Sequence, residues 1–600
     1  MSPAMRDART RERRPKRGMA SLAMLGLLSA AVAPAWSQSS ATDSDPDFTR
    51  SSIYVPVRDG TKLAVNIYRP RSAAESAGAK LPIIFAFTPY RARYFDKDHK
   101  IVDLIDSPQF GLRGMVKAGY AVATADVRGK GASFGTRRGF LDQTEAHDGY
   151  DLIQWLAAKP WASGKVGIIG CSYLGGSAML VAGTLPPALR AVFAAATDLD
   201  KYDFVRRGGI TAQFNTRPDE PPEVDLASVP VDADSDGAML KAAVAQHAGN
   251  TPMAKLWETM PYRDSVSPLT GNRFWEEVGP YTHLKALRSP RLAWYLWGNW
   301  EDEPTEQMIL NAANIPGAKL IIGPGSHCVP PKVFNINDEQ RRFFDHTLKG
   351  IDNGINREPH YAWYQEGPGA DGHMVRSDTL PGVGITRTAL YLTARPGDAP
   401  APFDKGGVAL SPPAASSLAF KVDYDVGKGE YFQFWPDPLD GRGLTFTSAP
   451  LAGDTTMTGY PVAHISAALD KPDANLFAYL EDVDPAGKVY IVSFGRLAAS
   501  HRKLSRAPYD ILDLPYHSGL KADVAPMVPG KTAEFVFSMM PRAYVFAAGH
   551  RLRVTLTGAD PRQRNLAKIR QDPPPTFTIA SGGADASRID IPFTTKPAFR

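Results

Sequence analysis

The stretch Val166-Gly-Ile-Ile-Gly-Cys-Ser-Tyr-Leu-Gly-Gly176 decides the fold class of this chain. It starts as a short apolar run typical of a buried strand and continues into small residues that favour a helix. Ser172 falls on the turn between them, where a tight turn leaves a serine hydroxyl exposed above a sheet. Such a turn requires small residues around the serine, which are here Gly170, Gly175 and Gly176. Leu174 departs from the strict pattern, and a serine that merely caps the helix is the alternative interpretation.

Strands and helices alternate on both sides of this turn. The predicted strands are the apolar runs 81–87, 120–126, 166–169, 189–196, 292–297 and 319–322, and 143–158 has the period of a helix. Residues 52–68 alternate around Asp59-Gly60, which predicts a hairpin. Strands that alternate with helices indicate a parallel sheet with helices on both faces.

Two segments break this pattern. Within an α/β domain that we place at 45–380, Pro, Asp and Gly interrupt short helical pieces between 199 and 284, which predicts an inserted helical cap. From 381 to 600, strand-length segments alternate with Gly, Pro and Asp turns, which predicts an all-β domain of the sandwich or jelly-roll type. The predicted fold class is therefore α/β, with an inserted helical cap and a C-terminal all-β jelly-roll domain.

The net charge bears on which partners the protein binds, and the N-terminal segment bears on where in or outside the cell it acts. A net charge of +5 over 600 residues, partly in the first twenty, does not indicate a nucleic-acid binder. Residues 1–37 combine basic residues, an apolar run at 19–32 and small residues before Ser37, which predicts a signal peptide. The run is shorter than the ~20 residues that cross a membrane. We expect a secreted or periplasmic protein with no stable membrane span after signal removal; a homo-oligomer is left open.

Ser172 becomes a nucleophile only with a base, and that base needs a carboxylate to orient it. His327 follows the predicted strand 319–322 in the loop Gly323-Pro-Gly-Ser-His327, at the end of the strand where catalytic groups gather. The acid should follow the preceding strand, where Glu301 and Asp302 both stand. The residues alone leave both carboxylates as candidates.

These motifs resemble, in order, a family of serine hydrolases, the cocaine-esterase and X-Pro dipeptidyl-peptidase-like (CocE/NonD) enzymes. The motifs that carry the resemblance are Thr88-Pro-Tyr90, Asp126-Val-Arg-Gly-Lys-Gly-Ala-Ser133, Gly170-Cys-Ser-Tyr-Leu-Gly175, Trp300-Glu-Asp302, Gly323-Pro-Gly-Ser-His327, Phe344-Asp-His-Thr-Leu-Lys-Gly-Ile351, Ser500-His-Arg502 and Ala548-Gly-His-Arg-Leu-Arg553.

The resemblance implies the α/β-hydrolase fold with the cap and jelly roll predicted above. It implies hydrolysis of small-molecule esters or activated amides through an acyl-enzyme. The sequence contains no P-loop and no H-E-x-x-H motif, so we expect no cofactor and no metal. The Tyr90 hydroxyl and the Tyr173 N–H are implied to bind the oxyanion. The family pattern favours Asp302 over Glu301 as the acid.

The chain has two cysteines, Cys171 beside the proposed nucleophile and Cys328 beside the proposed base. If Ser172 and His327 lie within hydrogen-bonding reach, their neighbours are close enough for a disulfide. Export would allow such a bond to persist. The arrangement is similar to that of tannases and feruloyl esterases. Two unrelated buried thiols are the alternative.

Substrate-binding residues are the least determined part of the sequence. Trp297 and Trp300 are candidates for an aromatic acyl pocket, or for the core. Glu303 and Asp198, with the carboxylates at 301 and 302, could bind an α-ammonium group, as in α-amino-acid ester hydrolases, or could be solvated. The alternative functions are therefore an α-amino-acid ester hydrolase or acylase, an X-Pro dipeptidyl-peptidase, and an inactive protein that binds carbohydrate or a partner.

Overall fold

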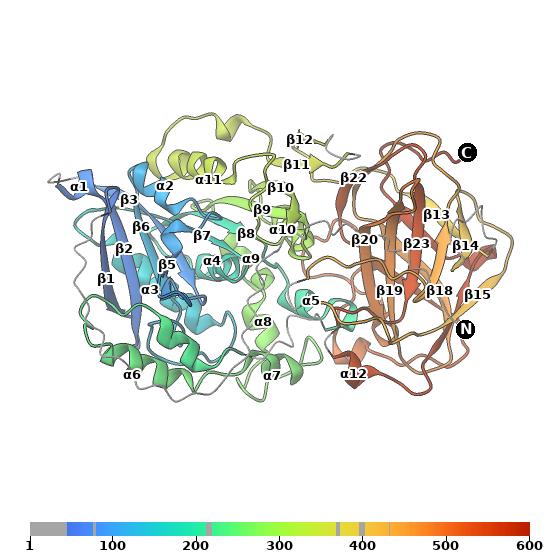
Figure 1. The fold of residues 1–600 in the computed structure, drawn as a ribbon, viewed down its shortest axis with the longest axis horizontal. Coiled ribbons are helices and arrows are strands. Elements are labelled where there is room, and N and C mark those ends of the chain that lie inside the picture. The colour runs from blue at the N-terminus through green and yellow to red at the C-terminus, as the bar shows by residue number, and fades with distance from the viewer. Residues whose placement is uncertain are drawn as a thin grey trace, which may run out of the picture. The chain divides into compact units, whose positions relative to one another are not determined.

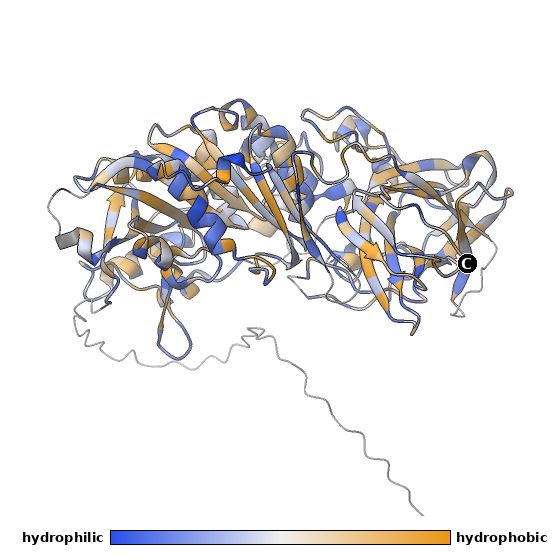
Figure 2. Cartoon of the chain, turned by 90° about the horizontal axis from the view of Figure 1, so that it is seen from above, coloured by the Kyte–Doolittle hydropathy of each residue, from blue (hydrophilic) through white to orange (hydrophobic). Residues whose placement is uncertain are grey.

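The computed structural model describes residues 45–75, 78, 80–211, 219–367, 372–394, 403–430, 433–563 and 565–600. The predicted signal peptide, 1–37, lies outside these residues. In the described part of the chain, no helix combines the length and the apolar character needed to cross a membrane. Figure 1 shows the fold, and the most hydrophobic segments in Figure 2 include strands of both of its large sheets.

The α/β domain is built on a ten-stranded sheet in the order β1-β2-β6-β3-β7-β8-β9-β10-β11-β12. Its strands are β1 (Phe48–Pro56), β2 (Lys62–Pro70), β3 (Leu81–Thr88), β6 (Ala121–Asp126), β7 (Ala162–Cys171), β8 (Leu189–Ala195), β9 (Ala293–Glu301), β10 (Lys319–Ser326), β11 (Tyr361–Gln365) and β12 (His373–Ser377). The strands from β6 to β11 pair in parallel, and β1, β2 and β12 pair antiparallel at the two edges. The predicted hairpin and parallel sheet are confirmed.

Helices cover both faces of this sheet because its central strands are apolar on both sides. On one face, α3 (Gln143–Ala157), α4 (Tyr173–Gly183) and α10 (Pro304–Asn314) contribute to one hydrophobic core. On the other face, α2 (Leu112–Lys117) and α11 (Ile336–Phe344) contribute to a second core. These two helices lie together at the top of the sheet in Figure 1. The parallel strands end at one edge, where functional groups of such folds gather.

Short helices occupy the chain between β8 and β9, where the cap was predicted. They are α5 (Lys201–Val205), α6 (Ala238–His247), α7 (Met253–Glu258), α8 (Phe274–Val278) and α9 (Leu284–Leu287). Several of them share a small aromatic core of their own, in which Trp257 stacks on Trp275 with ring centroids 4.8 Å apart. The insertion is thus a packed layer, and its residues form part of the pocket described below.

The C-terminal part is all β, as expected. Its strands are β13 (Thr388–Thr393), β14 (Asp404–Ala409), β15 (Ser417–Lys421), β16 (Leu444–Thr447), β17 (Thr455–Gly459), β18 (Val462–Leu469), β19 (Asn475–Val483), β20 (Val489–Ala498), β21 (Ala533–Ser538), β22 (Arg542–Phe546), β23 (Arg551–Thr557), β24 (Thr576–Ala580) and β25 (Arg588–Ile591). Most belong to one eleven-stranded sheet with its own core, and β17 pairs with β22 in a separate two-stranded sheet. The last strand of the first sheet ends at Ser377 and the first strand of the second sheet begins at Thr388, so the architecture changes between these two residues.

Candidate active site

Ser172 lies on a strained turn between β7 and α4. Its backbone has φ 61° and ψ −126°, a region that costs a non-glycine residue about 1–3 kcal/mol. The Ser172 N–H donates to the Ala195 carbonyl at 3.0 Å, and the Gly176 N–H donates to the Ser172 carbonyl at 3.0 Å. These two bonds fix the turn between β8 and the first turn of α4. Residues held in such strain often cluster at functional sites.

The glycines around the serine permit close packing that a side chain would block. A Cβ on Gly170 would lie 2.3 Å from the carbonyl oxygen of Leu174, and one on Gly175 would lie 2.5 Å from that of Ala195. Gly175 therefore lets α4 approach β8. Leu174, which occupies the position where the strict motif has glycine, is buried on the other face of the helix, in the core that also holds α2 and α11.

His327 follows β10 and is paired with a buried carboxylate. Its Nδ1 lies 2.9 Å from both Oδ1 and Oδ2 of Asp302, which follows β9. Burial raises the pKa of Asp302 above its ordinary value, and the charge of His327 opposes that shift. Glu301 lies elsewhere: it accepts a hydrogen bond at 3.0 Å from Nη2 of Arg542 in the β domain. Of the two carboxylates that the sequence left open, Asp302 is the one in contact with His327.

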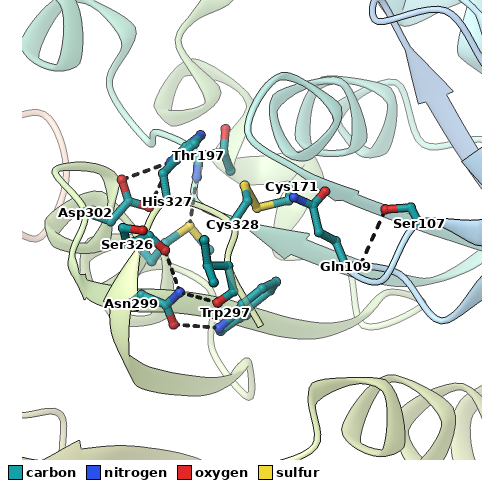
Figure 3. Close-up of a disulfide and its surroundings, with 12 residues drawn as sticks. Ser107, Gln109, Cys171, Thr197, Trp297, Asn299, Asp302, Ser326, His327 and Cys328 are labelled. Atoms are coloured by element: carbon teal, nitrogen blue, oxygen red, sulfur yellow. Dashed lines mark hydrogen bonds and ion pairs between the residues drawn. A yellow bond between two sulfur atoms is a disulfide. The ribbon is translucent and has the colours of Figure 1, made fainter. Parts of the chain in front are cut away.

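A buried asparagine, which the motifs of the sequence do not point to, holds the loop that carries His327. The Asn299 amide donates to the carbonyls of Ser326 at 2.7 Å and Val329 at 2.8 Å, which flank His327 in the chain. The indole N–H of Trp297 donates to Asn299 Oδ1 at 3.2 Å (Figure 3). A polar residue in the apolar strand β9 was the signal that could have identified it, because a buried amide requires hydrogen-bond partners.

Cys171 and Cys328 form a disulfide, as Figure 3 shows. Their Cα atoms are 6.1 Å apart, and both residues are buried. Cys171 directly precedes Ser172, and Cys328 directly follows His327. The disulfide therefore joins the turn that carries Ser172 to the loop that carries His327. The similarity of this arrangement to that of tannases and feruloyl esterases remains a prediction.

Ser172 and His327 share one cavity of about 1100 Å³. Its walls come from the loop around Tyr90, from the segment after β8, from the inserted helices and from one residue of the β domain, Phe434. The Phe434 ring stacks on the His327 imidazole with centroids 4.2 Å apart and planes inclined by 24°. The β domain thus packs an aromatic ring against the histidine.

Tyr90 and Tyr173 occupy the positions that the resemblance implied for oxyanion binding. Tyr90 lines the cavity with 56% of its surface exposed, and its ring centroid lies 6.2 Å from that of Tyr173. The loop that carries it is fixed by Asp126, whose Oδ1 accepts from the Ala92 N–H at 2.6 Å. The Tyr173 N–H belongs to the first turn of α4, where backbone N–H groups have no partner within the helix.

Three of the four predicted substrate-binding residues, Trp297, Trp300 and Glu303, lie outside the cavity and require correction. Trp297 and Trp300 are buried in the cores on opposite faces of the sheet, because their strand, β9, is central. Glu303 also lies outside the cavity walls, since it is held by the β-domain arginines Arg496, at 3.1 and 3.2 Å, and Arg562, at 3.1 Å. Asp198 does line the cavity but pairs with Lys201.

The carboxylates that could bind an ammonium group are therefore already engaged by other side chains of the chain. Burial favours the neutral form of Glu303, but Arg496 and Arg562 hold the pKa of its carboxyl below the ordinary value. Glu301 is paired with Arg542 and Asp302 with His327. Across the described residues, no group of three or more His, Cys, Asp or Glu side chains is arranged to hold a metal ion.

Known proteins are similar to this chain over nearly its whole length, in the α/β domain as well as in the β domain. Residues 59–329 match the X-Pro dipeptidyl-peptidase (S15) family, and residues 353–578 match the X-Pro dipeptidyl-peptidase C-terminal non-catalytic domain. A Mycobacterium bovis protein named "Putative serine esterase" is 30% identical over 90% of this chain and 95% of its own length. Cocaine esterase of a Rhodococcus species is 22% identical over 85% of this chain and 90% of its own.

Solved structures share the fold at low identity. A CocE/NonD family hydrolase from Staphylococcus aureus superposes with a TM-score of 0.67 at 19% identity, covering 91% of this chain and 94% of its own. An α-amino acid ester hydrolase gives a TM-score of 0.66 at 20% identity, covering 93% and 98%. Taken with the family matches and the serine esterase relative, these findings show that the chain belongs to the X-Pro dipeptidyl-peptidase (S15) and CocE/NonD family of serine hydrolases.

Proposed function

We propose that this enzyme hydrolyses small-molecule esters, or activated amides, through an acyl-enzyme formed on Ser172. The observation that carries the proposal is the contact between His327 and the buried Asp302 in a cavity that also holds the strained Ser172. A histidine oriented by a carboxylate, in the same cavity as a serine, is the arrangement required for acyl transfer.

In the proposed mechanism, the Ser172 oxygen attacks the substrate carbonyl carbon while His327 Nε2 accepts the hydroxyl proton. Asp302 holds the imidazole through Nδ1 and stabilises the imidazolium that results. The Tyr90 hydroxyl and the Tyr173 N–H donate hydrogen bonds to the oxyanion. Collapse of the tetrahedral intermediate releases the alcohol, which takes the proton from His327. Water, activated by the same histidine, then attacks the acyl-enzyme, frees the acid and restores Ser172.

The paired carboxylates favour ester hydrolysis over activities that need a free substrate amine. An α-amino-acid ester or an X-Pro dipeptide carries an ammonium group, which binds best to an unpaired carboxylate. Asp198, Glu301 and Glu303 are each bonded to a cationic side chain. An ammonium substrate would have to displace that cation or bind beside it, so we rank both activities below simple ester hydrolysis.

We propose further that the enzyme acts outside the cytoplasm, in the periplasm or after secretion. Two observations support this location: the predicted signal peptide at 1–37 and the disulfide between Cys171 and Cys328. Disulfides persist in oxidising compartments and are rare in the cytosol. Fractionation of cells that express the full chain, followed by N-terminal sequencing, tests the location; intact protein in the cytosol would contradict it.

Labelling with a fluorophosphonate probe tests the nucleophile. The wild type should be labelled and the variant Ser172→Ala should not; an unlabelled wild type would favour the inactive binding protein. Asp302→Asn should lower kcat by about 10⁴-fold, as removal of the orienting carboxylate does in serine proteases. Glu301→Gln is the matched control and should stay within a few-fold of the wild type, because Glu301 contacts Arg542 and not His327.

Tyr90→Phe tests the oxyanion donor without removing the ring from the cavity. Loss of one donor typically lowers kcat by about 10²–10³-fold. The measurement is kcat for a series of p-nitrophenyl esters, with aminoacyl esters and X-Pro anilides as comparison substrates. A preference for the aminoacyl substrates would contradict the ranking given above.

A further inference from the structure

A buried ion pair in the cavity wall has hydrogen-bonding capacity that the described chain does not use. Asp198 follows β8, whose last residue, Ala195, pairs in register with Cys171. Lys201 begins α5 three residues later. Both side chains line the cavity that contains Ser172, and each residue is only 3% exposed. The pair therefore lies at the same edge of the sheet as the proposed nucleophile.

One carboxylate oxygen of the pair is satisfied and the other is not. Asp198 Oδ1 accepts a hydrogen bond from Lys201 Nζ at 2.5 Å. Asp198 Oδ2 is buried and has no hydrogen-bond partner among the described residues. A buried polar atom without a partner is costly, and such atoms are uncommon in folded proteins. Asp198 lines the cavity, so a ligand donor that reaches Oδ2 from the cavity would supply the missing hydrogen bond.

The ammonium of the pair has spare donors as well. A lysine ammonium carries three N–H groups, and in the described chain one is directed at Asp198. Aromatic rings lie around it: Nζ is 5.4 Å from the centroid of Phe140 and 5.5 Å from that of Phe204. The Phe140 ring packs in turn against Tyr173, with centroids 4.6 Å apart. The polar pair is thus bordered by aromatic faces that continue to the residue after Ser172.

The charges decide which ligand group fits beside Asp198 and Lys201. A ligand ammonium could donate to Asp198 Oδ2, but it would face the Lys201 cation. A ligand carboxylate could accept from Lys201, but it would face the Asp198 oxygen that has no donor of its own. A hydroxyl group is neutral, donates one hydrogen bond and accepts others, so it alone of the three satisfies both partners.

We propose that Asp198 and Lys201 form a subsite for a hydroxyl carried on an aromatic ring, so that the enzyme prefers phenolic esters. The flanking Phe140 and Phe204 rings provide apolar surface for the aromatic ring, and the ion pair binds its hydroxyl. This inference rests on the proposed function at Ser172 and specifies its substrate class. The phenolic ring can belong to the acid or to the alcohol of the ester, and the experiment separates these two cases.

The test compares esters that differ in one substituent. On the acid side, methyl 4-hydroxycinnamate is compared with methyl cinnamate and methyl 4-methoxycinnamate; on the alcohol side, 2-(4-hydroxyphenyl)ethyl acetate is compared with 2-phenylethyl acetate. The methoxy compound has similar electronic effects but cannot donate. We expect kcat/KM to be roughly 10- to 100-fold higher for the hydroxyl compound in one of the two series, as for a hydrogen bond to charged groups. Equal values in both series would overturn the proposal.

Variants connect that preference to the ion pair. Removing one partner would leave a buried charge, so the informative variant is the double substitution Asp198→Asn with Lys201→Met, which removes both charges. In the series that shows the preference, the ratio of kcat/KM for the hydroxyl compound to that for its comparator without the hydroxyl should fall to near one. Because each ratio is measured on one preparation, the amount of folded enzyme cancels. A double variant that keeps the wild-type ratio would overturn the subsite.

Asp106→Asn serves as the matched control, because it removes a carboxylate that lines the same cavity but pairs with Arg113 at the surface. Its ratio should equal that of the wild type. Fluorophosphonate labelling separates the two proposals. An enzyme that is labelled but shows no hydroxyl preference refutes the subsite alone, whereas an enzyme that is neither labelled nor active on any of the esters refutes the proposed function and the subsite with it.

Discussion

Replacing Cys171 and Cys328 together by alanine should lower the free energy of unfolding by up to about 5 kcal/mol. The disulfide spans a sequence separation of 157 residues. A crosslink over a loop of that length removes about 5 kcal/mol of chain entropy from the unfolded state in the loop-closure model. Both cysteines are buried, and alanine fits each site without a new polar group, so loss of the crosslink should dominate the change.

Thermal unfolding of the wild type and the double variant measures this effect. Unfolding entropy grows with the number of residues that unfold together. We expect the midpoint to fall by about 4 °C if the whole chain from residue 45 onward unfolds as one unit, and by about 7 °C if the α/β domain unfolds separately. Dithiothreitol should lower the midpoint of the wild type and leave that of the variant unchanged. Equal midpoints for the oxidised wild type and the variant would refute the reasoning.

The same variant separates stability from catalysis. The contact of His327 with Asp302 and the bonds from Asn299 to its loop do not involve the disulfide. At a temperature where both proteins are folded, kcat for a p-nitrophenyl ester should therefore fall by less than about tenfold. A tenfold fall corresponds to a loss of about 1.4 kcal/mol of transition-state stabilisation. A loss of several orders of magnitude in a folded variant would show that the disulfide itself positions the histidine.

Three further predictions concern the surroundings of the proposed triad of Ser172, His327 and Asp302. Asn299→Ala removes both donors that fix the histidine loop, and kcat should fall by roughly 10- to 100-fold with little change in KM; an unchanged kcat would exclude Asn299 as a positioning residue. Arg496→Met leaves the buried Glu303 with fewer partners, and it should cost about 2–4 kcal/mol of unfolding free energy, measured in urea. Arg542 pairs with the partly exposed Glu301 and with Glu366, so Arg542→Met should lower the free energy of unfolding by less than Arg496→Met does. A larger loss for Arg542→Met would contradict the role of burial. Burial raises the pKa of Glu145 to about 7 from 4.5, so the folded chain retains a proton that the unfolded chain has lost, and stability due to this group should decline as pH rises from about 4.5 to 7. Glu145→Gln should flatten that decline, and identical urea midpoints for variant and wild type at every pH would contradict the assignment.

The sequence determined the architecture because its signals are local. Alternation of apolar residues, turn residues and the change from a period of 2 to one of 3.6 are recorded in short windows. The hairpin at 48–70, the strands around Ser172, the helix at 143–157 and the all-β domain were all readable in this way. The glycine at 170 was informative for the same reason, because the residue it packs against, Leu174, lies only four positions later in the chain.

The site residues depended on contacts that no short window contains. Trp300 looked suited to a pocket, but the central position of β9 places it in the core, where its N–H donates to the Tyr364 carbonyl. Glu303 has the side chain of a substrate ligand, but it is bonded to Arg496, which lies almost two hundred residues later in the chain. Sequence patterns carry no information on which distant cation reaches which carboxylate.

By itself, the sequence determined that Ser172 lies on a tight turn at the edge of a parallel sheet, with a histidine and a carboxylate at the ends of later strands. Only the tertiary structure decided between Glu301 and Asp302, because successive side chains at the end of a strand point to opposite sides. It also decided that Asp198 is paired with Lys201 and still has one open oxygen. The end of a strand determines where a residue lies in the fold, but the packing of distant segments determines which other side chains it contacts.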